Sequence, residues 1–266
     1  MEIIKNYHNI FKTSSLSSFK NLCFKFKTEL YKSSKSLNSI GSRLATMNTW
    51  IKNNLGPKYF NISKDILKLD KKDKQKQMKT QKDGYVEKLS NRIPIDVKIY
   101  MALIEKLKSS SNFIELVACF NLATGRRLIE IISQGDIKKI DNHWVEFKGQ
   151  AKTKDKIKKY KIPIILLTSD ELIELFKKIR SFKQKINVPY VSKEVSKLYK
   201  KYFRQDITSE MIRGAYVQIS YHLYETSKVS LPIWGNMVLG HAKNDLATYT
   251  YNYDRIYLVN ESKIFS

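Results

Sequence analysis

The C-terminal third of this sequence combines a histidine with closely spaced tyrosines. The stretch VLGHAKNDLATYTYNYDRI, residues 238–256, places His241 directly after a glycine. Three tyrosines follow it closely: Tyr249, Tyr251 and Tyr253. A phenol with a pKa of about 10 is a poor nucleophile at neutral pH, so it attacks a phosphate only when cations neutralise that phosphate. The stretch therefore points to phosphate chemistry only if arginines and a lysine stand elsewhere in the chain.

A pair of arginines stands in ATGRRLIEII, residues 123–132. Arg126 and Arg127 are predicted to begin a helix after Gly125, where a guanidinium and free backbone N–H groups together can clamp a phosphate. Glu130, one turn further on, could orient the clamp. The alternative is an ordinary surface salt bridge between residues three apart, and this motif alone favours that alternative.

Lysines dominate the segment FKGQAKTKDKIKKYK, which holds seven lysines and one aspartate. Gly149 marks a turn, so Lys152 is the best-placed lysine and Lys154 the second. A lysine on a hairpin tip can reach into a DNA groove and protonate a leaving oxygen. The other lysines of this segment are expected to be solvated.

A further arginine, Arg213, is predicted to precede a helix in TSEMIRGAYVQISYHLY. The apolar face of that helix would include Tyr216, Ile219 and Leu223. By itself Arg213 is more typical of a structural ion pair, with Glu210 as the partner.

The charge balance favours a polyanionic partner. Lys and Arg number 49 against 25 Asp and Glu, a net charge of +24, and nucleic acid is the commonest partner of such a chain. The alternative is a lysine-rich composition inherited from an AT-rich genome. Cys23 and Cys119 have no metal-ligand spacing, and no metal-ligand set or Gly-rich phosphate loop is present, so cationic side chains would have to hold any phosphate.

The hydrophobic pattern predicts a mainly α protein with a small antiparallel β-sheet. Residues 1–63 are predicted to form a helical N-terminal domain. One of its helices carries an apolar stripe of Leu16, Phe19, Leu22, Cys23, Phe26 and Leu30. Residues 64–90 are a basic linker or an exposed helix. Residues 91–266 are predicted to form a larger, mostly α domain, with strands around HWVEF and IPIILL and helices from Ser169 to the end.

Taken in order, these motifs resemble the tyrosine recombinase superfamily, which carries T-G-x-R-x-x-E, a hairpin lysine, H/K-x-x-R, L-G-H and a C-terminal tyrosine. Here they read TGRRLIE, GQAK, EMIR, LGH and YTYNY. Within it, GRRLIEI, FKGQAKTK, VLGHAKNDLAT and RGAYVQISY are most similar to the telomere resolvases, or protelomerases. The resemblance implies that residues 91–266 are a recombinase-like catalytic domain and that residues 1–63 are a helical DNA-binding domain.

The resemblance also implies the catalytic residues. Arg127 matches the first catalytic arginine, Lys152 the hairpin lysine, Arg213 the second arginine and His241 the L-G-H histidine. Tyr251 is the favoured nucleophile, since it needs a shift of one residue from the family spacing and precedes an asparagine.

Two departures and several accessory residues accompany this match. Tyr253 needs a shift of the same size as Tyr251, and Tyr249 is a poorer third choice. Glu210 stands where the family has His, Lys or Tyr, and a carboxylate there would repel phosphate unless it swings away or has another role. DNA contacts are expected from four basic residues: Arg126, Lys148, Lys154 and Lys158.

By this resemblance the chain would resolve replicated telomere junctions into covalently closed hairpin ends through a 3′-phosphotyrosine. No cofactor is expected, neither a metal nor ATP. The partner would be double-stranded DNA with an inverted-repeat telomere junction, bound by a homodimer. Strand exchange between two duplexes by a site-specific recombinase or integrase is the main alternative, and a degenerate relative that only binds DNA is another.

Location follows from the absence of export signals. No apolar run reaches transmembrane length and the first residues lack a signal-peptide core. The expectation is a cytoplasmic, nucleoid-associated protein with no membrane partner, encoded by a bacterium or a phage.

Overall fold

The computed structural model describes residues 2–34, 36–151, 159–182, 187–225, 228–240 and 254–260. The chain divides into two compact units, Met1–Val86 and Glu87–Ser266. The sequence predicted a first domain ending at residue 63, but Ile66 and Leu67 lie in the hydrophobic core of the first unit. The predicted linker therefore begins inside that unit rather than after it.

The first unit is built from helices only. They are α1 (Glu2–Thr13), α2 (Leu16–Ser33), α3 (Leu37–Asn54), α4 (Pro57–Ile66) and α5 (Lys71–Ser90). The predicted apolar stripe forms the buried face of α2, with Phe19, Cys23, Phe26 and Leu30 buried. Leu16 is 45% exposed because it stands at the start of the helix, outside that face.

The change from α3 to α4 occurs at a glycine and a proline. Gly56 has a φ of 85°, a backbone conformation that glycine adopts at little cost. Pro57 then begins α4, where a missing N–H is harmless because the first turn of a helix leaves its N–H groups unpaired.

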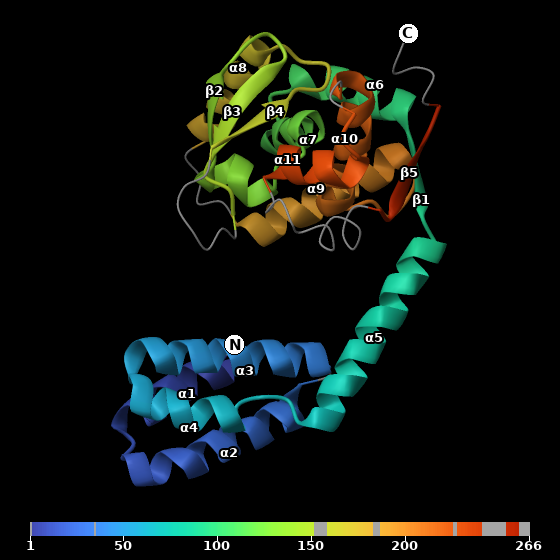
Figure 1. Ribbon diagram of the computed structural model, residues 1–266. Helices are drawn as coiled ribbons and strands as arrows, with labels where there is room; N and C mark the ends of the chain where they lie inside the picture. The colour runs from blue at the N-terminus through green and yellow to red at the C-terminus, as the bar shows by residue number, and fades with distance from the viewer. Residues whose placement is uncertain are drawn as a thin grey trace. The chain divides into compact units, whose positions relative to one another are not determined.

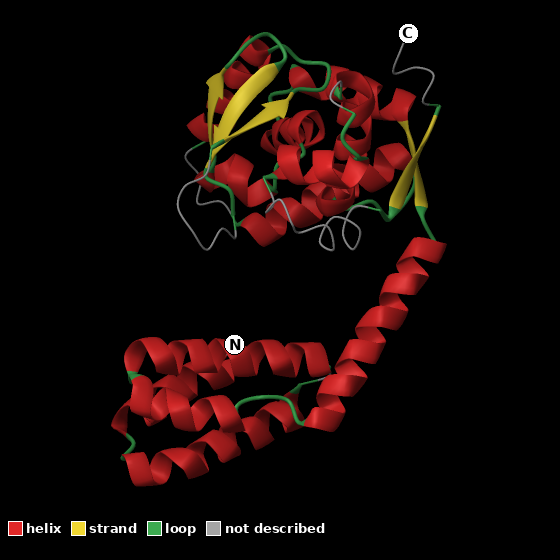
Figure 2. Ribbon diagram, viewed as in Figure 1, coloured by secondary structure: helices red, strands yellow, loops and turns green. Residues whose placement is uncertain are grey.

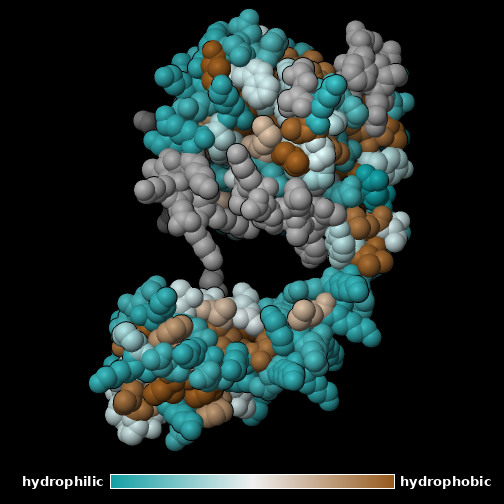
Figure 3. Space-filling model, viewed as in Figure 1, coloured by the Kyte–Doolittle hydropathy of each residue, from teal (hydrophilic) through white to brown (hydrophobic). Residues whose placement is uncertain are grey.

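The basic segment that follows is helix α5, one of the two possibilities that the sequence left open. Its start contacts α2: the Tyr31 hydroxyl donates to Asp73 Oδ2 at 2.7 Å, and Lys27 Nζ lies 2.7 Å from Oδ1 of Asp70, the residue before the helix. On the face seen in Figure 3 the surface along α5 is mostly hydrophilic. The helix has no apolar stripe of its own, so polar contacts connect it to α2 and, through Gln77 and Gln81, to the start of α3.

In the second unit the other elements are arranged around one central helix (Figure 1). Its elements are β1 (Ile93–Asp96), α6 (Val97–Lys108), α7 (Phe113–Thr124), η1 (Glu130–Gln134), β2 (Asp136–Lys139), β3 (Trp144–Lys148), β4 (Tyr160–Pro163), α8 (Ser169–Ser181), α9 (Val188–Phe203), α10 (Ser209–Tyr224), α11 (Leu231–Leu239) and β5 (Ile256–Val259). Helix α7 is buried all round from Leu116 to Thr124, as expected of a helix without a polar face. It packs against α6, α8, α9 and α10.

Two sheets flank these helices on opposite sides of the unit (Figure 2). The larger is antiparallel in the order β2–β3–β4, with Phe147 paired to Tyr160 across the β3–β4 hairpin. This confirms the predicted hairpin sheet. Strand β4 begins at Tyr160 and ends at Pro163, so most of the apolar run IPIILL lies beyond the strand.

The second sheet corrects the sequence-based prediction for the C-terminal part. Helices were expected from Ser169 to the end, but Ile256–Val259 form strand β5, parallel to β1. Ile, Tyr and Val favour strands, but a run of four apolar residues fits a helix as well, and the strand that pairs with it lies more than 150 residues away, which explains the error. Ile256 and Leu258 are buried, and Arg92 Nη2 donates to the Ile256 carbonyl at 2.7 Å. None of the helices in the described part of the chain is long and apolar enough to cross a membrane.

Candidate active site

Arg127 lies in the turn that follows α7, and Glu130 is the first residue of η1. Helix α7 ends at Gly125, whose φ of 63° turns the chain sharply, and Arg126 and Arg127 are therefore not yet helical. Arg127 Nη1 donates to Glu130 Oε1 at 3.0 Å, and the Arg127 backbone N–H donates to Glu130 Oε2 at 3.1 Å. This is a pair three residues apart, as the alternative interpretation proposed, but it is not a surface pair because Glu130 is 0% exposed.

The Glu130 carboxylate is held ionised by its neighbours. Burial alone would raise its pKa, yet the pKa is lowered because Arg126, Arg213 and Arg127 lie near and the Arg127 backbone N–H donates to it. The Ala151 N–H donates to Glu130 Oε1 at 3.0 Å as well. Glu130 therefore serves as a fixed negative charge that links the arginine turn to the β3–β4 hairpin.

Arg126 does not have the role that the sequence suggested. Its side chain is fully buried, with Nε donating to the Thr124 carbonyl at 3.2 Å, Nη2 to the Val238 carbonyl at 2.6 Å and Nη1 to the Tyr160 hydroxyl. A DNA phosphate cannot reach a guanidinium in that position. The expectation that Arg126 contacts DNA is therefore corrected: it is an interior residue.

Arg213 lies in the first turns of α10 rather than before the helix, because Thr208 caps that helix and accepts from the Met211 N–H. The Arg213 side chain is 1% exposed, and its Nε lies 3.9 Å from Oε1 of the half-exposed Glu210. Its charge contributes to the lowered pKa of Glu130. Arg127 and Arg213, 86 positions apart in the chain, thus lie around one carboxylate.

The hairpin stem approaches the same cluster. Gly149 has a φ of 90° and lies against the backbone of Gln134, so a larger residue would not fit there. Lys148 ends β3 and is half-buried. The other lysines predicted for this hairpin lie outside the described residues: Lys152, Lys154 and Lys158.

The end of α11 completes the described part of the site. Gly240 ends this helix with a φ of 71°, and a Cβ at this position would lie 2.6 Å from Cζ of Tyr160. Gln150 Nε2 donates to the Leu239 carbonyl at 3.0 Å. The residues predicted to act after this point lie outside the described residues: His241, Tyr249, Tyr251 and Tyr253.

A family model for the catalytic domain of the telomere resolvases ResT and TelK matches residues 91–255, more than half of the chain. The chain belongs to the telomere resolvase family. Family membership confirms the sequence-based prediction that this is a DNA cleaving-rejoining enzyme that resolves replicated telomere junctions. None of the curated protein sequences compared with this resolvase matches it.

Solved structures of other protelomerases share the fold of the resolvase. Two variants of protelomerase TelA, each covalently complexed with substrate DNA, match with TM-scores of 0.79 and 0.81 at 18% and 17% identity. The matches cover 94% and 98% of this chain and 86% and 89% of those chains. Protelomerase TelK complexed with substrate DNA matches with a TM-score of 0.63 at 17% identity, over 97% of this chain and 58% of that chain.

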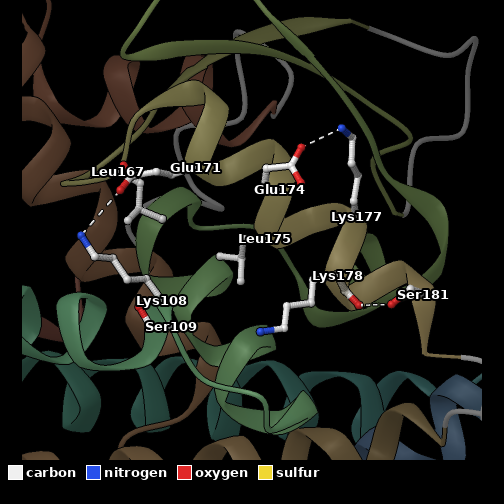
Figure 4. A pocket seen from close by; sticks show the side chains of 9 residues that line it. All are labelled: Lys108, Ser109, Leu167, Glu171, Glu174, Leu175, Lys177, Lys178 and Ser181. Atoms are coloured by element: carbon white, nitrogen blue, oxygen red, sulfur yellow. Dashed lines mark hydrogen bonds and ion pairs between the residues drawn. The ribbon is translucent and has the colours of Figure 1, made fainter.

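A surface pocket of about 600 Å³ lies apart from this arginine cluster, between α8 and the end of α6 (Figure 4). Its charged side chains have partners: Lys177 Nζ lies 2.7 Å from Glu174 Oε1, and Lys178 Nζ donates to the Ser110 carbonyl at 2.7 Å. None of the predicted site residues lines this pocket. In the described parts of the resolvase, no group of three His, Cys, Asp or Glu side chains is arranged to hold a metal ion.

Sequence reasoning missed Tyr160, which lies between Arg126 and the end of α11. Burial is the main reason that the pKa of its hydroxyl is raised, so the hydroxyl stays neutral and can accept from Arg126. In the sequence it is one aromatic residue at the start of a strand, with no feature that sets it apart. Only the tertiary contact identifies it.

We expect Gly125→Ala to destabilise the second unit of the resolvase by about 3 kcal/mol, from left-handed strain and overpacking together. A Cβ at Gly125 would lie 2.3 Å from Cδ1 of Tyr216. That ring is fully buried and its hydroxyl donates to the Pro163 carbonyl at 2.8 Å, so it has no room to move. Urea unfolding followed by circular dichroism measures the change.

Gly84→Ala is the matched control. Gly84 lies inside α5 and a Cβ there meets no heavy atom within 4 Å. Alanine is the better helix former by about 1 kcal/mol, so this variant should be unchanged or slightly stabilised. Equal effects of the two substitutions would contradict the geometry described for Gly125.

Proposed function

We propose that this resolvase cleaves DNA with Tyr251 as the nucleophile and conserves the bond energy in a 3′-phosphotyrosine. The observation that supports this most is the buried cluster of Arg127, Glu130 and Arg213, with Arg126 behind it. Three guanidinium groups and one carboxylate leave two net positive charges in a place shielded from water. Substrate DNA bound covalently to protelomerase TelA, the protein with a similar fold, supports double-stranded DNA as the partner.

In the proposed cleavage step, the Tyr251 oxygen attacks the scissile phosphorus in line and gives its proton to water. The bond between phosphorus and the 5′ oxygen breaks, and its electron pair stays on that oxygen. The ammonium of Lys152 donates a proton to it, giving a free 5′ hydroxyl. In the second step the 5′ hydroxyl of the opposite strand on the same side attacks the phosphotyrosine and releases Tyr251, which closes a hairpin.

The arginines act on the negative charge that develops on the phosphate in the transition state of each step. A phosphodiester carries one negative charge, and its pentacovalent transition state carries about two. Cations that are already fixed in direction toward the scissile phosphate stabilise the transition state more than the ground state, because they do not have to reorganise. Arg127 is the better contact for a nonbridging oxygen, since its side chain is 15% exposed while that of Arg213 is 1% exposed. His241 would donate to the other nonbridging oxygen.

Glu210 Oε1 lies 3.9 Å from Arg213 Nε, so the carboxylate is directed toward this arginine and not away from it. We assign it an accessory role, holding the Arg213 side chain in the direction of the cluster. Lys148, Lys154 and Lys158 would contact the DNA backbone. A homodimer on an inverted-repeat junction would supply one active site for each strand, and the enzyme would work in the cytoplasm at the nucleoid of a linear replicon.

The experiment mixes the protein, in EDTA and without ATP, with a duplex that carries the replicated junction of its own replicon ends. Products are separated on a denaturing gel, beside reactions of Tyr251→Phe, Tyr253→Phe and Tyr249→Phe. The wild-type protein is expected to produce closed hairpins. Tyr251→Phe is expected to be the only one of the three variants that forms no covalent adduct. If Tyr253→Phe is the inactive variant instead, the assignment of the nucleophile is wrong while the reaction stands.

Other outcomes separate the alternatives. Strands exchanged between two duplexes without hairpins would point to a recombinase. A requirement for a divalent cation or ATP would contradict the proposed mechanism. Retarded DNA with neither adduct nor hairpin would indicate a protein that only binds DNA, and would overturn the proposal.

A further inference from the structure

Arg126 joins three segments of the catalytic unit that are far apart in the chain. Its guanidinium donates to the Thr124 carbonyl before it, to the Tyr160 hydroxyl 34 positions away and to the Val238 carbonyl 112 positions away. These acceptors belong to the end of α7, the start of β4 and the last turn of α11. One buried side chain therefore connects the arginine turn, the hairpin and the helix that precedes the L-G-H histidine.

The surroundings of Arg126 require an arginine. Its guanidinium carbon lies 5.2 Å from the centre of the Phe147 ring and 5.2 Å from that of the Tyr160 ring, which pair across the β3–β4 hairpin. A planar fork with five donors can reach several acceptors at once while it stacks on aromatic faces, whereas a lysine presents one ammonium. The site thus uses both the shape and the charge of the group.

Around Arg126 the hairpin stem and the end of α11 fit closely. Gln150 Nε2 donates to the Leu239 carbonyl at 3.0 Å, and a Cβ on Gly240 would lie 2.6 Å from Cζ of Tyr160. Packed interiors transmit displacements, so a change in a group that is bonded to both segments acts on both of them. A change at Arg126 would therefore move both segments relative to Arg127.

We propose that Arg126 is a positioning residue for the cleavage reaction. It keeps the hairpin stem and the end of α11 in register with Arg127, and these two segments lead directly to Lys152 and His241 in the sequence. This inference rests on the proposed function. Misplacing a reacting group by about 1 Å costs about 100-fold in rate, so the effect on cleavage should be large although Arg126 does not touch the substrate.

The test uses three variants of the full chain. Arg126→Lys keeps the charge and loses the fork, and Tyr160→Phe removes one acceptor and keeps the ring. Tyr100→Phe is the matched control, since it removes another buried hydroxyl of the same unit, one that donates to the Leu122 carbonyl at 2.7 Å and reaches neither the hairpin nor α11. Single-turnover rates of covalent adduct formation are measured at saturating protein, together with the melting temperature of each variant.

Each variant is tested on two forms of the junction duplex. One has the natural scissile phosphodiester and the other has sulfur in place of the bridging 5′ oxygen. When the phosphorus–sulfur bond breaks, its electron pair stays on sulfur as a stable thiolate, so this leaving group needs no proton. The second substrate therefore removes the need for a correctly placed lysine.

On the natural substrate we expect Arg126→Lys to slow cleavage about 100-fold and Tyr160→Phe about 10-fold, with Tyr100→Phe within about twofold of wild type. On the sulfur substrate Tyr160→Phe, which disturbs the hairpin side, should return to within about threefold of wild type. Arg126→Lys should recover only in part, because it also disturbs the end of α11.

The proposal is overturned if Arg126→Lys cleaves the natural substrate at the wild-type rate, or if Tyr100→Phe loses as much rate as Tyr160→Phe for the same loss of melting temperature. Equal slowing of Tyr160→Phe on both substrates would also overturn it. If the wild-type protein forms no adduct with either substrate, it is the proposed function that fails.

Discussion

Arg127→Ala is expected to lower the rate of covalent adduct formation by about 1,000-fold or more, the range found when a transition-state arginine is removed. Arg127 is the partly exposed member of the arginine cluster, and its Nη1 is oriented by the buried carboxylate of Glu130 at 3.0 Å. An oriented guanidinium needs no reorganisation when charge develops on the phosphate. Equilibrium binding of the junction duplex should change much less than the rate.

A second substrate makes the prediction for Arg127 specific. A methylphosphonate at the scissile position removes the negative charge on a nonbridging oxygen, so Arg127→Ala should lose far less rate on it than on the natural phosphodiester. Arg204→Ala is the control for the loss of one positive charge, since Arg204 is exposed at the end of α9. A loss that is equal on both substrates would contradict a role at the nonbridging oxygens.

The second large effect is expected on stability. Glu130→Gln should lower the free energy of unfolding of the second unit by about 3–5 kcal/mol at pH 7, as when one partner of a buried ion pair is removed. The substitution keeps the size of the side chain but leaves Arg126, Arg127 and Arg213 without their shared negative charge. It also weakens the bond from the Ala151 N–H, which ties the hairpin to the arginine turn.

The pH dependence follows from the lowered pKa of Glu130. A carboxyl whose pKa is lower in the folded than in the unfolded chain contributes stability that is fully present above the unfolded value. For Glu130 that ordinary value is 4.5, so its contribution should be lost as the pH falls below this value and through the lower pKa of the folded state. The Gln variant should lack this part of the acid sensitivity.

Urea unfolding at pH 7 and at several pH values below 5 checks this prediction, with Glu146→Gln as the control. Glu146 pairs with Lys159 at 3.0 Å on the exposed sheet, and such a surface pair is worth about 1 kcal/mol or less. A Glu130→Gln variant as stable as the control, or with the same acid sensitivity as wild type, would show that the buried charge does not hold the cluster together.

Short stretches of the sequence were sufficient to predict the family and several local elements of the fold. The motif TGRRLIE, the lysine-rich hairpin, EMIR and LGH in this order were sufficient for the family, because catalytic residue types and spacings are local features. The apolar stripe of α2 and the Gly56–Pro57 break were also predictable, since side-chain periodicity and glycine or proline geometry act over a few residues. The β3–β4 hairpin follows from the same kind of signal.

What the tertiary structure decided are the contacts between distant segments. From the sequence, Arg127 was expected to be catalytic and Arg126 to contact DNA, so both were expected to be accessible. The structure buries Arg126 beside Tyr160 and Val238, while Arg127 stays partly exposed. Likewise the apolar run Ile256–Val259 is too short to separate a strand from a helix, and its pairing with β1, far away in the chain, decides that it is a strand. The surroundings of a charge and the pairing of a short strand depend on residues brought together only by packing, and a local pattern carries no information about them.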